Sequence, residues 1–171
     1  LRLVDVLWCS GVSVAVYALA RYPFAGGVIE AEGVRRARAF FGSPNNLALY
    51  IERILPLGLA VAVWGGTPWR RRLYGLGSVP VALALLMTFS RGALLLGVPA
   101  ALLVLAWLGR GWAGWILAGL GTVAIVATTA LSGTDRLWSL LDSSGGTSFL
   151  RLSLWQASWD MVRDHPWLGV G

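Results

Sequence analysis

Residues 73–109 have the sequence LYGLGSVPVALALLMTFSRGALLLGVPAALLVLAWLG, in which Arg91 is the one charged residue. A helix needs about 20 mostly apolar residues to cross the ~30 Å hydrocarbon core of a bilayer. The stretch reads as two such helices, at 73–89 and 93–108, each a little shorter than a full span, with a Ser-Arg-Gly bend around Arg91 between them. The sequence therefore predicts a helical hairpin in a membrane.

Three further apolar stretches accompany this hairpin, at 3–20, 45–64 and 112–131. We therefore expect an all-α fold, a polytopic bundle of transmembrane helices with about five spans, formed by residues 1–171 as a single membrane domain. We expect a loop over residues 21–44, with or without an amphipathic turn, because this stretch holds the charged residues Arg21, Glu30, Glu32, Arg35, Arg36 and Arg38. We expect residues 132–171 to lie outside the bilayer as well, as the start of a second such segment.

The composition excludes several classes of protein. Apolar residues make up 57% of the chain and charged residues 13%, about half the ~25% of an ordinary soluble domain. Such a chain has too little polar surface for a soluble domain and too many apolar residues for disorder. All 14 basic residues are arginine, so a P-loop, which needs lysine, is excluded. The net charge is +6, and the arginines that cause it lie between apolar stretches. This placement indicates membrane lipids or a phosphorylated substrate as partner rather than nucleic acid.

Single cysteine and histidine residues limit the metal chemistry of the chain. Cys9 alone excludes an internal disulfide framework and a cysteine-based zinc site. His165 alone excludes a site that this chain would build from several histidines. We expect no metal site of these kinds, and no cofactor.

Five spans also predict an orientation. Arg70–Arg72 and Arg110 fall in short loops on one side, and these loops contain no acidic residue. The positive-inside rule places such loops in the cytoplasm. Segments 21–44 and 132–171 and the bend at Arg91 are then extracytoplasmic, where the rule disfavours arginine. These arginines therefore need another reason for their position.

Arg91 is the first candidate for a functional residue. A charge between two spans is often only an anchor that reaches the membrane surface. Alternatively, Ser90 caps the helix that begins near Gly92, and the free N–H groups of that helix join the guanidinium of Arg91 in an oxyanion or phosphate site. Ionisable residues at membrane depth are functional candidates by default.

Arg151 is the second candidate. Residues 149–164 have helical period, with Leu152, Trp155, Trp159 and Val162 on one face and Ser153, Gln156, Asp160 and Arg163 on the other. Arg151 lies at the edge of the apolar face, apart from the other polar residues. It is either a structural residue there or points inward at an anion. Together, Arg91 and Arg151 have the chemistry to clamp a diphosphate through bidentate, charge-assisted contacts.

The remaining charged residues allow two interpretations each. Arg35, Arg36 and Arg38 form either a solvated charged face or an auxiliary site for lipid phosphates. Glu52 and Arg53 form an ion pair that holds the second span, or belong to the site. His165 precedes Pro166 at a helix end and is more often structural than catalytic there, and Asp5 marks the interfacial end of the first span.

Four segments, taken in order, resemble the O-antigen ligase and polymerase superfamily, and the resemblance covers about 130 residues from Gly42 onward. No one of these short motifs is specific alone, and the ordered set carries the resemblance. The segments are Gly42-Ser43-Pro44-Asn45-Asn46-Leu47-Ala48 at the start of a span, Ser90-Arg91-Gly92-Ala93 at a span boundary, Arg151 with Trp155-Gln156-Ala157, and Asp164-His165-Pro166-Trp167-Leu168-Gly169-Val170-Gly171.

This resemblance implies a bacterial multi-pass protein of the plasma (inner) membrane. Family members transfer a glycan from undecaprenyl diphosphate, on the extracytoplasmic face, to a hydroxyl of the lipid A core of lipopolysaccharide, of a growing polysaccharide or of a protein. The family is regarded as independent of metals, and its arginines, here Arg91 and Arg151, are thought to hold the diphosphate. Its general base is usually ascribed to a histidine downstream of the Gly-x-Gly segment, beyond Gly171, so His165 is not that base.

The chain opens with Leu1-Arg2-Leu3 and stops at Gly169-Val170-Gly171. We interpret it as the donor-binding piece of a larger enzyme, inactive alone. The alternative from another class is a fragment of a transporter or flippase for an anionic or lipid-linked substrate, since charged residues in helices broken by Pro and Gly also suit transporters. Transporters place such charges near the midplane and often contain inverted repeats, and neither feature is present here. A membrane-anchored structural or sensor module is the third interpretation.

Overall fold

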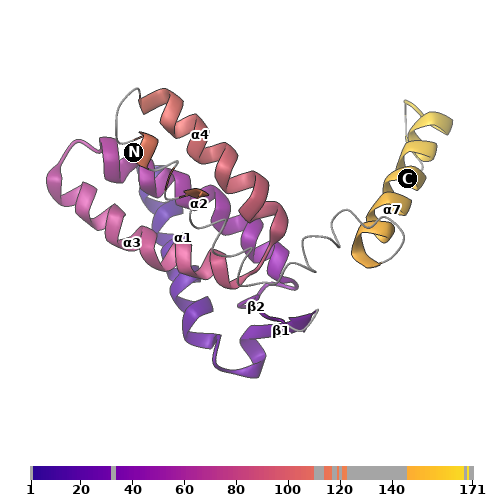
Figure 1. Ribbon diagram of the computed structural model, residues 1–171, viewed down its shortest axis with the longest axis horizontal. Coiled ribbons are helices and arrows are strands. Elements are labelled where there is room, and N and C mark those ends of the chain that lie inside the picture. Colours follow the sequence, from indigo (N-terminus) through magenta and orange to yellow (C-terminus); the bar gives the residue numbers. More distant parts are fainter. Residues whose placement is uncertain are drawn as a thin grey trace. The chain divides into compact units, whose positions relative to one another are not determined.

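The computed structural model describes residues 2–31, 34–109, 114–116, 119, 121–122, 146–167 and 169. The chain divides into two units, Leu1–Thr128 and Thr129–Gly171, which are considered separately below. The first unit is a bundle of helices with a small β-hairpin at one end (Figure 1).

Helices occupy most of the segments in which spans were predicted. Two of them begin with the same device, a capping hydroxyl followed by proline. Ser43 accepts from the backbone N–H of Asn46 at 3.2 Å, and Thr67 accepts from that of Arg70 at 3.4 Å. The helices of the first unit are α1 (Arg2–Arg21), α2 (Pro44–Trp64), α3 (Pro68–Met87) and α4 (Val98–Gly109). Helix α3 thus begins before the predicted boundary at Leu73 and includes the arginine run.

Among the described residues, α1 and α2 are long and apolar enough to cross a membrane, and Ala93–Gly109 is a shorter apolar helix. Helix α3 carries three arginines in its first turns. The fifth predicted span, 112–131, lies largely outside the described residues.

The prediction that 21–44 is only a loop was wrong. A 3-10 turn, η1 (Ala25–Gly27), leads into an antiparallel hairpin of β1 (Val28–Ala31) and β2 (Val34–Ala37). The register pairs Val28 with Ala37 and Glu30 with Arg35. The fold is therefore mostly helical rather than all-α, because this short segment satisfies its backbone polar groups by strand pairing.

The bundle core lies where α1, α2 and α3 meet. Small residues let the helices approach closely: Ala15 and Ala18 of α1 are fully buried, and a side chain at Gly11 would overlap Ile54 of α2. The other fully or nearly fully buried side chains of this cluster include Leu47, Ile51, Val81, Ala84 and Leu85.

A second cluster forms around Trp8 of α1. Its ring stacks on Tyr74 of α3 at 4.2 Å between centroids and is 6% exposed. Gly58 and Gly77 provide the space, since a methyl group on either would lie within about 3 Å of the indole. The glycines therefore allow α1 to place a large aromatic residue between α2 and α3.

We expect Gly77→Ala to lower the stability of the bundle by about 1–3 kcal/mol, because the added methyl overpacks a filled core. The new carbon would stand 2.2 Å from Cζ2 of Trp8, a rigid buried ring. Gly75→Ala is the matched control on the same helix, since its nearest neighbour would be Ala62 at 3.8 Å. Thermal unfolding of the full-length protein in detergent compares the two. Equal midpoints for both variants would contradict the packing described here.

Asp5 joins α1 to α3 at the end of the bundle opposite the hairpin. Its Oδ1 accepts from Nη2 of Arg70 at 2.5 Å and from the hydroxyl of Tyr74. The predicted interfacial end of the first span is thus an ion pair with the arginine run, and this contact places the start of α1 beside the start of α3.

Removal of that carboxylate in Asp5→Ala should cost about 1–2 kcal/mol of stability, because two partly buried donors lose their charged acceptor. The comparison is Glu30→Ala, which breaks an exposed pair with Arg35 at 3.8 Å and is expected to cost less than about 1 kcal/mol. Unfolding midpoints of both variants in detergent check the order. A Glu30 variant as destabilised as the Asp5 variant would show the ranking to be wrong.

In the second unit, helix α7 (Gly146–Asp164) confirms the helix predicted at 149–164. It begins three residues before the predicted start, and Trp155 and Trp159 on it are exposed.

Candidate functional site

The bend between α3 and α4 is built from residues 88–92. Helix α3 ends at Met87, and Phe89 then adopts a left-handed backbone conformation with φ 47°. The helix resumes with Arg91, and the carbonyl of Ser90 accepts the N–H of Leu94 at 2.9 Å. The predicted bend is therefore confirmed, and Arg91 stands in the first turn of a new helix.

Capping by the Ser90 side chain was predicted, and the structure shows another arrangement. The hydroxyl of Thr88 accepts the backbone N–H of Ser90 at 3.2 Å, and it donates to the carbonyl of Leu85 at 2.6 Å. Both Thr88 and Ser90 are buried. Thr88 holds the bend because its hydroxyl reaches both sides of the break, which a serine two residues later cannot do.

A π-turn, η2 (Ala93–Gly97), begins two residues after Arg91. The N–H of Val98 bonds to the carbonyl of Ala93, five residues back, which is the spacing that defines a π-turn. Pro99 has no N–H to offer Leu95, so an α-helical ladder would be broken at this point. Turns of this kind are frequent at functional sites.

The hairpin brings the three predicted arginines to different environments. Arg35 donates to the carbonyl of Tyr22 at 3.3 Å, and its guanidinium lies 5.8 Å from the Tyr22 ring centroid. Arg36, the next residue on the strand, is directed to the other face, as strand geometry requires. Its Nε donates to the carbonyl of Thr88 at 2.8 Å, and its Nη2 donates to Oδ1 of Asn45 at 2.9 Å.

Arg38 follows β2, and its Nε is buried with no hydrogen-bond partner among the described residues. The next residue, Ala39, has φ 53°, a conformation that costs a residue with a side chain about 1 kcal/mol or more. An unsatisfied buried donor and local strain often accompany a functional site. The structure thus separates Arg38 from the well-paired Arg35.

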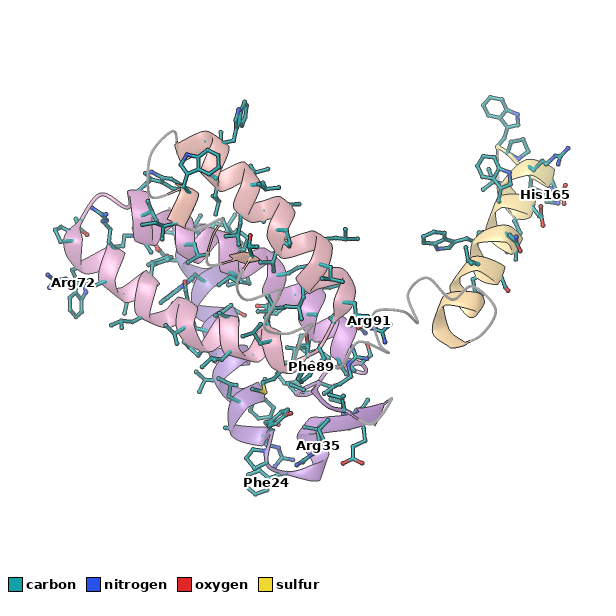
Figure 2. All side chains as sticks on the ribbon, in the orientation of Figure 1. Phe24, Arg35, Arg72, Phe89, Arg91 and His165 are labelled. Carbon is teal, nitrogen blue, oxygen red and sulfur yellow. The ribbon has the colours of Figure 1, made fainter. Side chains whose placement is uncertain are left out.

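Residues from three segments therefore meet at one end of the first unit. Arg36 of β2, Asn45 at the start of α2 and Thr88 at the bend are joined directly. Figure 2 shows Arg91 beside Phe89 at this end and Arg72 at the other end of α3. The sequence pattern did not single out Thr88. Asn45 was included in a motif, but no contact was predicted for it.

The predicted ion pair between Glu52 and Arg53 is absent from the ion pairs of the described residues. Neighbouring residues on a helix do not face each other. Glu52 instead lies against the π-turn, since a methyl group on Gly97 would stand 2.6 Å from its Oε2. Glycine at 97 thus makes room for a carboxylate from α2.

The other predicted residues belong to the second unit. Arg151 lies within α7, and exposed His165 follows the end of that helix (Figure 2). Arg91 and Arg151 belong to different units, and a clamp formed by the two stays a prediction. No group of three or more His, Cys, Asp or Glu side chains that would suit a metal occurs in the described parts of the chain.

This arrangement offers cationic donors at a helix start and few groups for acid–base chemistry, and it suits the binding of an anion such as a phosphate. A family model described as O-antigen ligase matches residues 76–171, more than half of the chain. No curated protein and no solved structure matches the chain.

Proposed function

The chain belongs to the O-antigen ligase family, and we propose that it forms the donor-binding part of a bacterial membrane glycosyltransferase. The enzyme moves a glycan from undecaprenyl diphosphate to an acceptor hydroxyl of the lipid A core, a growing polysaccharide or a protein. In this proposal Arg91 and Arg151 hold the diphosphate. Family membership and the apolar helices make the chain a membrane protein.

The observation that carries the proposal is the position of Arg91. It stands in the first turn of a helix, at a bend that is tied to the hairpin and to the start of α2. Free N–H groups and the positive end of the helix dipole favour an anion at such a place. Arg38, with its unsatisfied Nε, adds a cation from the same segment. Arg35 is engaged with Tyr22 and Glu30 on the other face, and we leave it outside the site.

Displacement at the anomeric carbon develops negative charge on the departing diphosphate. Positioned guanidinium groups stabilise that charge more in the transition state than in the ground state, and this difference accelerates the reaction. The acceptor hydroxyl needs a general base. In this proposal the base is a residue outside the donor-binding part, as the family resemblance implies. No cofactor or metal is required.

The proposed topology has five spans in the plasma membrane: α1, α2, α3, the helix that resumes at Arg91, and a fifth at 112–131. The Asp5–Arg70 contact joins the two segment ends that this topology places in the cytoplasm. The Arg36–Thr88 contact joins two segments that it places outside. Both contacts therefore agree with an alternation of helix directions.

The test is transfer of a lipid-linked glycan by the full-length protein in membrane vesicles with a chelator present. The proposal expects a glycosylated acceptor and release of undecaprenyl diphosphate. Movement of the intact lipid-linked glycan across the bilayer without cleavage would favour the alternative, a flippase or transporter. Transfer that stops with the chelator and returns with a divalent metal would contradict the proposed chemistry.

A further inference from the structure

Arg36 makes two contacts that join the hairpin to neighbouring parts of the bundle, one at the start of α2 and one at the bend after α3. Its guanidinium donates to the Thr88 carbonyl at 2.8 Å and to Oδ1 of Asn45 at 2.9 Å, and both contacts are partly buried. The planar fork of arginine suits two acceptors in fixed directions, which lysine cannot match. The side chain of Arg36 therefore holds β2 at a fixed distance from the start of α2 and at a fixed distance from the bend.

The bend itself needs external support. A helix leaves its last four carbonyls without partners, and a glycine in the left-handed conformation usually ends it. Here Phe89 takes that conformation with φ 47°, which is strained for a residue with a side chain. The positive charge of Arg36 at the Thr88 carbonyl favours this helix end, because the dipole there is negative.

We propose that Arg36 is a positioning residue that acts through Arg91. It holds the bend in the strained conformation from which the next helix starts, and so directs Arg91 toward the diphosphate. The inference rests on the proposed function, and it assigns to Arg36 a role other than direct contact with the donor.

Kinetics of the full-length protein distinguish this role from direct binding. Arg36→Gln is expected to lower kcat per folded enzyme by about 10- to 100-fold, the scale of a small misplacement of a reacting group, with the donor KM within about threefold of wild type. Arg36→Lys should recover part of the loss, because it keeps the charge at Thr88. Arg35→Gln, one residue away on the opposite face, is the matched control and should leave kcat unchanged. Equal losses for the two glutamine variants, or a loss confined to the donor KM, would overturn the proposal.

A double-variant cycle separates positioning from a general structural defect. In an Arg91→Lys background, the bidentate geometry that Arg36 supports is already lost. Arg36→Gln should then reduce kcat by less than about threefold further, because residues that act as a unit are not additive. If the loss of kcat in the double variant equals the product of the two single-variant losses, Arg36 acts independently of Arg91, and the proposal fails.

Hydrogen exchange gives a readout that does not depend on activity. In Arg36→Gln, amides of residues 88–94 should exchange at least about tenfold faster than in wild type and in Arg35→Gln, because the bend opens more easily. Unchanged exchange in this segment would overturn the positioning role. If the wild-type protein transfers no glycan, the proposed function fails, and the exchange result still decides whether Arg36 holds the bend.

Discussion

Arg91→Ala is expected to reduce glycan transfer by about 10²- to 10³-fold, the loss typical when one positioned donor to a developing oxyanion is removed. The structure places Arg91 in the first turn after a bend, where the helix dipole adds to its charge. Because this charge matters most when the diphosphate departs, kcat should fall more than the donor KM rises. Initial rates with a lipid-linked donor in vesicles measure both quantities.

Arg72→Ala provides the control for Arg91→Ala. Arg72 is an exposed arginine at the opposite end of α3 (Figure 2), and its removal should change transfer by less than about twofold. Both variants must accumulate in the membrane at wild-type levels. If the Arg91 variant keeps full transfer, Arg91 is an interfacial anchor. Family membership would then indicate common ancestry, and the mechanism proposed for Arg91 would be wrong.

The second large effect is expected at Arg151. Arg151→Ala should also lower transfer by about 10²-fold or more, because a diphosphate held by one arginine loses its bidentate, charge-assisted partner. The control lies on the same helix: Arg163 occupies the polar face of α7 and is exposed. Arg163→Ala should keep at least half of the wild-type rate. Equal losses in the two variants would indicate a general role of charge on α7 rather than a specific contact.

The positions of the helices were predictable because hydropathy over long stretches dominates local detail. Helices α1 and α2 match their predicted ranges within two residues, and α7 contains its predicted range. The start of α3 was placed too late because the arginine run was treated as a loop, although a Thr-Pro cap precedes it. The predicted start of α3 followed the last charged residue of the arginine run, whereas the observed start follows the capping residue Thr67.

The hairpin escaped prediction for a physical reason. Each strand has four residues and carries charges, and its stability comes from pairing with the other strand and contact with the bundle. The roles of Arg35 and Arg36 depend on which face of β2 each occupies. That choice follows from the register with β1 and from the position of Thr88, neither of which a sequence pattern supplies.

Candidate residues on the bend were easier to predict than their contacts. The Ser-Arg-Gly motif marked the bend correctly, since a lone charge between two apolar stretches is conspicuous. The backbone N–H of Ser90 bonds to Thr88, and the carboxylate of Glu52 lies close to Gly97. Such contacts depend on close approaches between helices.

The π-turn after Arg91 has a consequence for comparison between related chains. A π-turn accommodates one residue more than an α-turn, and one residue corresponds to about 100° of rotation. A helical wheel drawn without interruption from Arg91 to Gly109 therefore assigns the wrong face to one of its halves. A relative that lacks this extra residue would align with a gap inside an apolar helix rather than in a loop. The turn allows the direction of the arginine and the buried face of α4 to change independently during evolution.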